Sequence, residues 1–157
     1  MNQNTKNNGA NVKFPPPLVY IIWMIMGAIL QNCFLTDMGI PFNYQYWGLG
    51  MVIGGVFLII YFQLLFKKMD TNIKPWEPTK NIITTGVYAY SRNPIYVVFN
   101  IFPIGLGIFF DNLWVLLSFI PALYTVYYLA IKKEEAYLEA TFGEEYLDYK
   151  KKVRRWI

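Results

Sequence analysis

The stretch WGLGMVIGGVFLIIYFQLLF, residues 47–66, decides the fold class because all 20 of its residues are uncharged and most are apolar. A helix that crosses a bilayer core needs about 20 predominantly apolar residues. Three further runs, at residues 18–35, 95–110 and 113–131, have a similar composition. The sequence therefore predicts an all-α, polytopic membrane helical bundle with about four transmembrane helices. A soluble helical protein is disfavoured, because four such runs leave too little polar surface.

Charge placement extends this prediction to topology. The 157 residues form one predicted membrane domain, 55% of them are hydrophobic, and the net charge is +4. Residues 36–46 and 111–112, which join the spans on one side, contain no lysine or arginine. By the positive-inside rule, both termini are expected to be cytoplasmic. The basic residues adjoin the ends of the spans, which indicates contact with membrane lipids and argues against nucleic acid.

Single residues predict a few local features. Residues 1–13 are rich in asparagine and are expected to be disordered, with no signal-peptide pattern. Cys33, the one cysteine, excludes an internal disulfide and is expected to pack against neighbours. Pro103 and Pro121 are expected to kink the third and fourth spans. The chain has no histidine, and no metal site is predicted.

The C-terminal segment, residues 132–157, is expected to be cytoplasmic, helical and amphipathic. Its apolar and aromatic residues recur at mostly helical spacing, at Tyr137, Leu138, Phe142, Tyr146, Tyr149 and Val153. Gly143 interrupts this pattern, so we expect two helices that meet there.

Two polar stretches adjoin the third and fourth apolar runs. The first is TTGVYAYSRNPIY, residues 84–96, and the second is EEAYLEATFGEEYLDY, residues 134–149. An apolar helical hairpin separates them in the sequence, so the fold can bring them together on one membrane face. A polar pocket at that face is a place where a water-soluble cofactor can meet a lipidic substrate.

The dipeptide Asn93-Pro94 predicts the start of the third span. Asparagine is a favoured N-cap residue, and proline is favoured at the first helical position. The free N–H groups of a helix start can bind a carboxylate or phosphate. On the dipeptide alone, an ordinary helix cap with no ligand is the favoured interpretation.

Together these residues resemble the isoprenylcysteine carboxyl methyltransferase family. The family signature runs Thr-x-Gly-x-Tyr, Arg-His-Pro-x-Tyr, a helical hairpin, Glu-Glu and Phe-Gly-x-x-Tyr-x-x-Tyr. The resemblance covers about half of the chain, from Lys80 to the end. The matching residues, in order, are Thr84 or Thr85, Gly86, Tyr88, Arg92, Asn93, Pro94, Tyr96, Glu134, Glu135, Phe142, Gly143, Glu144, Glu145, Tyr146 and Tyr149.

The resemblance implies a membrane methyltransferase whose cofactor is S-adenosyl-L-methionine. It also implies a lipidic or prenylated substrate reached from the bilayer, and a cofactor pocket closed by the C-terminal segment. The implied catalytic candidates are Arg92, Tyr96 and Glu134. The implied cofactor-binding residues are Lys80, Asn81, Ile82, Ile83, Tyr88, Asn93, Pro94, Ile95, Tyr96 and Glu134.

This chain departs from the family pattern at two positions. The family histidine is Asn93 here, and a family arginine associated with the substrate carboxylate falls at Ala130. A carboxylate acceptor is already ionised, so its methylation needs alignment and exclusion of water but no general base. An amine acceptor must lose a proton, so a base helps. The alternatives to carboxylate methylation are a phospholipid N-methyltransferase and a membrane protein that has lost catalysis.

Overall fold

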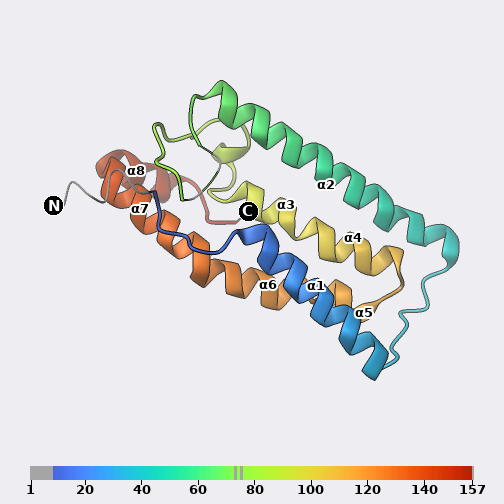
Figure 1. Ribbon diagram of the computed structural model, residues 1–157. Helices are drawn as coiled ribbons and strands as arrows, with labels where there is room; N and C mark the ends of the chain where they lie inside the picture. The colour runs from blue at the N-terminus through green and yellow to red at the C-terminus, as the bar shows by residue number, and fades with distance from the viewer. Residues whose placement is uncertain (1–8, 73, 75, 157) are drawn as a thin grey trace. The chain divides into compact units, whose positions relative to one another are not determined.

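The computed structural model describes residues 9–72, 74 and 76–156, and within them the regular elements are helices joined by turns and irregular segments, with one isolated bridge between Asp37 and Asn112 (Figure 1). The all-α fold class is thereby confirmed. The helices are α1 (Pro16–Cys33), α2 (Phe42–Lys68), η2 (Gly86–Ala89), α3 (Pro94–Phe99), α4 (Ile101–Phe109), α5 (Leu113–Leu117), α6 (Phe119–Val126), the π-helical turn η3 (Tyr127–Ile131), α7 (Lys132–Phe142) and α8 (Glu144–Lys152).

Three helical segments of the described chain are long and apolar enough to cross a membrane. They are Pro16–Cys33, Phe42–Lys68 and Leu113–Phe142, with mean hydropathies of 1.4, 2.3 and 1.7. The segment Pro94–Phe109 is apolar but shorter. The chain is therefore a helical membrane protein, in which the last long helix continues beyond residue 131 into α7.

Both short-helix breaks follow from prolines. Helix α3 ends at Phe99 and α5 ends at Leu117, each four residues before a proline. Because Pro103 and Pro121 have no N–H, the carbonyl four residues earlier loses its helical partner. The interruptions of these two spans thus lie where the prolines predict them.

The chain divides into two compact units. The apolar unit contains Pro15–Ile60 and Tyr96–Val126, and the polar unit contains Met1–Phe14, Tyr61–Ile95 and Tyr127–Ile157. Both units are discontinuous in sequence, so each is assembled from segments that lie far apart along the chain.

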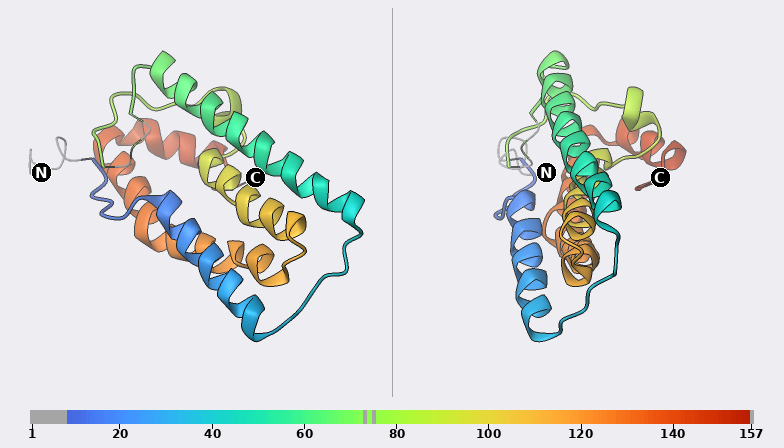
Figure 2. Two further views of the ribbon diagram at one scale, coloured as in Figure 1. Left: turned by 45° about the vertical axis from the view of Figure 1, so that its right-hand side comes forward. Right: turned by 90° about the vertical axis from the view of Figure 1, so that its right-hand side faces the viewer.

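The apolar unit is held by close helix packing. Helix α1 lies against α5 and α6, and α4 lies against α5 (Figure 2). A Cβ placed on Gly27 would lie 2.6 Å from the carbonyl oxygen of Trp114, and one on Gly107 would lie 2.5 Å from the amide nitrogen of Leu116. These positions need glycine because backbone approaches backbone, as in other membrane helix pairs.

The predictions for the N-terminal segment and for Cys33 have different outcomes. Residues 1–8 of the expected disordered segment lie outside the described residues, whereas Ala10 and Val12 are described and buried. Cys33 is exposed, so the expectation that it packs against neighbours is wrong. It is the last residue of α1, where the helix leaves its packing partners.

Candidate functional site

The two polar stretches predicted to meet do so within the polar unit. The hydroxyl of Tyr149, on α8, donates to the carbonyl of Tyr88 at 2.7 Å and to that of Ser91 at 3.5 Å. The amide of Arg92 donates to the carbonyl of Arg154 at 2.9 Å. Residues that lie about 60 positions apart in the sequence therefore form one polar cluster.

The residues after α8 run directly along the stretch 91–93. We call residues 153–156 the C-terminal strap. The carbonyl of Arg155 accepts hydrogen bonds from the Ser91 hydroxyl and from the Asn93 side-chain amide, both at 3.3 Å. The Ser91 hydroxyl also accepts from the Asn93 backbone amide at 3.2 Å. The strap thus fixes the side chain that precedes the first residue of α3.

An ion cluster joins α7 to both the strap and this stretch. The carboxylate of Glu135 accepts two hydrogen bonds from Arg155, from Nε and Nη2, each at 2.9 Å. Arg92 Nη1 lies 3.0 Å from Glu135 Oε1 in an ion pair. The guanidinium of Arg155 also lies 5.1 Å from the ring centre of Tyr127, a cation–π distance.

This cluster is largely shielded from solvent. The side chains of Arg92, Glu135 and Arg155 are 8%, 11% and 34% exposed. The hydrogen bonds to Glu135 raise the pKa of Arg155. Arg92 Nε is buried and has no hydrogen-bond partner among the residues that the structure describes. Two guanidinium groups facing one carboxylate leave a positive excess, which suits a site that receives an anion.

Three buried tyrosines surround the cluster. Tyr88 packs edge-on against Phe62 and Phe66, with ring centres 6.2 and 6.0 Å apart. Burial raises the pKa of Tyr88, and the charge of Glu134 raises it further. Burial likewise raises the pKa values of Tyr146 and Tyr149. These hydroxyls stay neutral at physiological pH, and that of Tyr149 donates a hydrogen bond to the Tyr88 carbonyl.

The predicted cofactor residues from Lys80 to Ile83 lie in an irregular segment of the polar unit. Lys80 Nζ lies 3.0 Å from both carboxylate oxygens of Asp70, on the surface. The Asn81 side chain donates to the Met69 carbonyl at 3.3 Å. Ile82 is half-buried and Ile83 is buried.

The predicted residues at the start of the third span divide between the units. Pro94 is the first residue of α3, as predicted, and Asn93 directly precedes it. Ile95 is half-buried and is the last residue of this part of the polar unit. Tyr96 belongs to the apolar unit, where its carbonyl accepts from the Tyr20 hydroxyl at 3.4 Å. Its role stays a prediction.

Sequence reasoning selected Glu134 and missed the role of its neighbour. Glu134 is half-buried, and its charge acts on Tyr88. Glu135 is the buried acid that binds Arg92 and Arg155. A pair of acids at residues 134–135 and a pair of arginines at residues 154–155 were visible in the sequence. Their pairing depends on the turn at Gly143, which spacing alone does not give.

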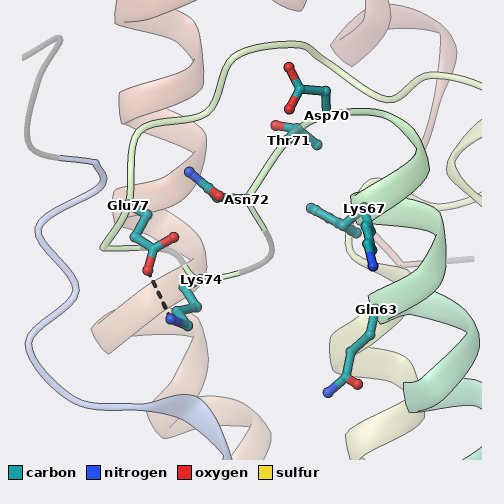
Figure 3. Close-up of a pocket in the computed structure, with 8 residues that line it drawn as sticks. Gln63, Lys67, Asp70, Thr71, Asn72, Lys74 and Glu77 are labelled. Atoms are coloured by element: carbon teal, nitrogen blue, oxygen red, sulfur yellow. Dashed lines mark hydrogen bonds and ion pairs between the residues drawn. The ribbon is translucent and has the colours of Figure 1, made fainter.

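A cavity of about 380 Å³, lined mostly by polar residues, opens beside this region at the C-terminal end of α2 (Figure 3). Lys74 and Glu77 form an ion pair of 2.9 Å at its edge. Its lining residues are Gln63, Phe66, Lys67, Asp70, Thr71, Asn72, Lys74 and Glu77. The cavity borders the predicted cofactor residues, because Phe66 contacts Tyr88 and Asp70 binds Lys80.

The chain belongs to the family whose model is described as phospholipid methyltransferase, which matches residues 44–145. It is 40% identical to the protein-S-isoprenylcysteine O-methyltransferase of Schizosaccharomyces pombe over 72 residues, 46% of this chain and 30% of that protein. It is 26% identical to the Xenopus laevis enzyme of the same name over 136 residues, 87% of this chain and 38% of that protein. The resemblance to the isoprenylcysteine carboxyl methyltransferase family is thereby confirmed.

These relatives are much longer than the matched region. The chain spans 30% of the Schizosaccharomyces pombe protein and 38% of the Xenopus laevis protein. The family model, over residues 44–145, contains the first polar stretch and most of the second, so the family relation bears on the region where the predicted site lies.

Proposed function

We propose that this chain is a membrane methyltransferase that uses S-adenosyl-L-methionine and methylates a lipidic acceptor. One observation carries the proposal. Tyr88, Arg92 and Glu135, which the family motif shares with this chain, and Asn93, at the position of the family histidine, gather in the polar unit around the ion cluster and the strap. A motif spread over 60 residues that folds into one buried polar cluster is typical of a binding site.

The residues of this cluster fit the proposed cofactor. S-adenosyl-L-methionine carries a carboxylate, an ammonium group, ribose hydroxyls and an adenine ring. Arg92 offers a buried donor that no described residue satisfies, and Glu134 offers an acid for the ammonium group or a ribose hydroxyl. Asn93 offers its amide. The nearby cavity, at about 380 Å³, lies in the size range of small-molecule sites.

When bound, the cofactor supplies an activated methyl group, and the protein supplies positioning and a dry environment. Tyr146 and Glu135 are buried, and Tyr149 closes on the Tyr88 carbonyl, so water is kept from this part of the polar unit. A carboxylate acceptor needs no general base. Our first choice of acceptor is therefore a lipidic carboxylate of the isoprenylcysteine type.

A second acceptor class is supported by Ala130. This position, where the family has an arginine associated with the substrate carboxylate, is 1% exposed within the π-helical turn η3. The nearby Lys132 and Lys133 are exposed on α7. Without an arginine there, an acceptor that lacks a carboxylate, such as the amine headgroup of a phospholipid, becomes the alternative, and Glu134 is its candidate base.

The first test is binding of S-adenosylhomocysteine, the demethylated cofactor, to detergent-solubilised protein by calorimetry. Glu134→Gln removes a charge-assisted hydrogen bond worth roughly 1.5–3 kcal/mol, so affinity should fall about tenfold to a hundredfold. Glu139→Gln, which removes an exposed acid from the same helix, is the matched control and should bind like wild type. Wild-type protein that binds neither S-adenosylmethionine nor S-adenosylhomocysteine contradicts the proposal.

The second test identifies the acceptor. Membranes with and without the protein are incubated with cofactor carrying a labelled methyl group, and the lipids are extracted. Mild alkali releases the label as methanol from a methyl ester, whereas an N-methyl group stays on its lipid. Binding of the cofactor without any labelled product would instead favour a protein that has lost catalysis.

We also propose that both termini lie in the cytoplasm, because the segments 36–46 and 111–112 carry no basic residue. Helix α2 has 27 residues, about 40 Å at 1.5 Å per residue, so its two ends can lie on opposite membrane faces. In a Cys33→Ser background, a membrane-impermeant thiol reagent should label Asp37→Cys from outside and Lys68→Cys only after the membrane is opened. Labelling of both from outside would refute this orientation.

A further inference from the structure

The C-terminal strap is attached to the polar unit in two different ways. Its backbone is bonded to Ser91, Arg92 and Asn93, and its Arg155 side chain is bonded to Glu135. One residue, Arg155, therefore makes both kinds of contact. Its carbonyl holds the Asn93 amide, and its guanidinium is held by α7. The position of the Asn93 amide is thus linked, through a single residue, to the carboxylate of Glu135.

We propose that Glu135 is a positioning residue that orients Asn93 for cofactor binding, acting through Arg155 of the strap. This inference rests on the proposed function and adds a role for a residue pair outside the predicted contact set. The bidentate bond fixes the plane of the Arg155 guanidinium, and Arg92 pairs with Oε1 of the same carboxylate. Asn93 then presents its amide in one orientation.

The connection between α7 and α8 explains why the strap needs the bond between Glu135 and Arg155, which we call the clasp. The two helices meet at Gly143, whose φ of +55° is a left-handed value that favours glycine. A Cβ built there would meet nothing within 4 Å, so the space where a side chain would stand at this joint is open. Helix α8 and the strap therefore depend on their own contacts for their position.

Two of the contacts that provide that position can be tested separately. Tyr149 ties α8 to the carbonyl of Tyr88. Glu135 ties the strap, beyond the end of α8, to α7. Loss of Glu135 should release the strap while the bond from Tyr149 keeps α8 in place. The expected result is a local change at residues 91–93, with the fold retained.

The first arm of the test needs no cofactor. The Arg92 amide donates to the strap at Arg154, so its hydrogen exchange reports whether the strap is closed. Exchange is followed by mass spectrometry on wild type, Glu135→Gln and Glu139→Gln in detergent. Glu139 also lies on α7 and pairs with Lys150 on α8, but it is exposed, which makes it the matched control. We expect about tenfold faster exchange at Arg92 in Glu135→Gln and wild-type exchange in the control.

The second arm measures S-adenosylhomocysteine affinity in a double-mutant cycle between Glu135→Gln and Asn93→Ala. A positioning residue acts through Asn93, so Glu135→Gln should weaken binding about tenfold in the wild-type background and have no further effect in Asn93→Ala. A residue that only stabilises the fold gives additive losses. Arg155→Lys, which keeps the charge but loses the bidentate geometry, should reproduce the loss seen with Glu135→Gln.

The outcomes separate this inference from the proposed function. Unchanged exchange at Arg92 in Glu135→Gln overturns the clasp, whatever the protein binds. Faster exchange with additive binding losses overturns the positioning role and leaves the methyltransferase proposal intact. Wild-type protein that binds no cofactor overturns the proposed function and the positioning role together, while the exchange data still report on the clasp.

Discussion

Each of the two units of this chain is stabilised internally by a different kind of contact. In the apolar unit, glycines let helices approach until backbone meets backbone, as at Gly48, where an added Cβ would clash with the carbonyl of Gly105. In the polar unit, hydrogen bonds and ion pairs join segments that are distant in sequence, and the buried carboxylate of Glu135 is bonded from two sides. The apolar unit is therefore sensitive to added volume, and the polar unit is sensitive to lost charge.

The difference follows from the surroundings of each unit. Helices in lipid gain little from burying apolar side chains, because lipid tails are equally apolar, so close packing and a few polar contacts hold them. Buried charges, in contrast, are expensive unless each is paired. Mutations of equal size should thus have different costs in the two units.

The largest expected effect tests the glycine contacts of the apolar unit. Gly48→Leu on α2 places a side chain against the backbone of Gly105 and Phe109, which cannot move aside. We expect a loss of about 3 kcal/mol or more in stability, or no folded protein. Gly54→Leu, on the same helix with nothing within 4 Å, should be tolerated. Thermal unfolding in detergent measures both, and equal losses would contradict the packing described for Gly48.

The next effect tests the polar unit by removing charge without adding volume. Glu135→Leu leaves two guanidinium groups without their shared carboxylate, and we expect a loss of about 3 kcal/mol, since breaking a buried ion pair costs about 3–5 kcal/mol and Arg155 is partly solvated. Glu139→Leu on the same helix removes an exposed ion pair and should cost under about 1 kcal/mol. Similar losses in the two variants would show that the cluster is not shielded as described.

A third effect appears at alkaline pH. Burial raises the pKa values of Tyr88, Tyr146 and Tyr149 above the ordinary value of 10.0. The folded state therefore keeps protons that the unfolded chain releases, so stability is full below pH 10 and falls as pH rises further. Between its pKa in the unfolded chain and its higher pKa in the folded state, each tyrosine lowers the free energy of unfolding by about 1.4 kcal/mol per pH unit.

Tyr149→Phe tests this pH dependence. The variant should lose about 1 kcal/mol at neutral pH, with its bond to the Tyr88 carbonyl, and show a shallower decline above pH 10. Tyr90→Phe is the control, because Tyr90 is 79% exposed. Denaturant unfolding between pH 8 and 11 measures both variants, and an unchanged slope in Tyr149→Phe would argue against its burial.

The fold was largely predictable because its signals are local. An uncharged run such as residues 47–66 needs a helix in lipid, whatever the rest of the chain does. Pro103 and Pro121 predicted kinks in the third and fourth spans, and each of these helices is interrupted four positions before its proline, at the carbonyl that a missing N–H leaves without a partner. The end of the last long helix was less predictable. Nothing local stops it at residue 131, and it continues into α7.

The predicted site was accessible to sequence reasoning only in part. The family motif indicated that residues 84–96 and 134–149 meet, and they do. The motif did not indicate which of two adjacent acids becomes buried, because that depends on the rotation of α7. It also gave no role to Arg155, which follows the matched segment and reaches Glu135 only because the chain turns at Gly143.

The smallest expected effect concerns Asn93, which stands where the family has histidine. It tests the contribution of a single side chain of the polar unit. The Asn93 amide donates to the Arg155 carbonyl at 3.3 Å and cannot titrate, so cofactor affinity should be constant between pH 6 and 8. Asn93→His keeps an N–H donor and should bind, with a change of a few-fold centred at or below about pH 6.5, because Arg92 and Arg155 disfavour a second cation. Asn93→Leu removes the donor and should weaken binding about fivefold, or roughly 1 kcal/mol. Calorimetry with S-adenosylhomocysteine across this pH range compares the three proteins. Wild-type affinity in Asn93→Leu would mean that Asn93 only connects η2 to α3 and that the proposed cofactor site lies elsewhere.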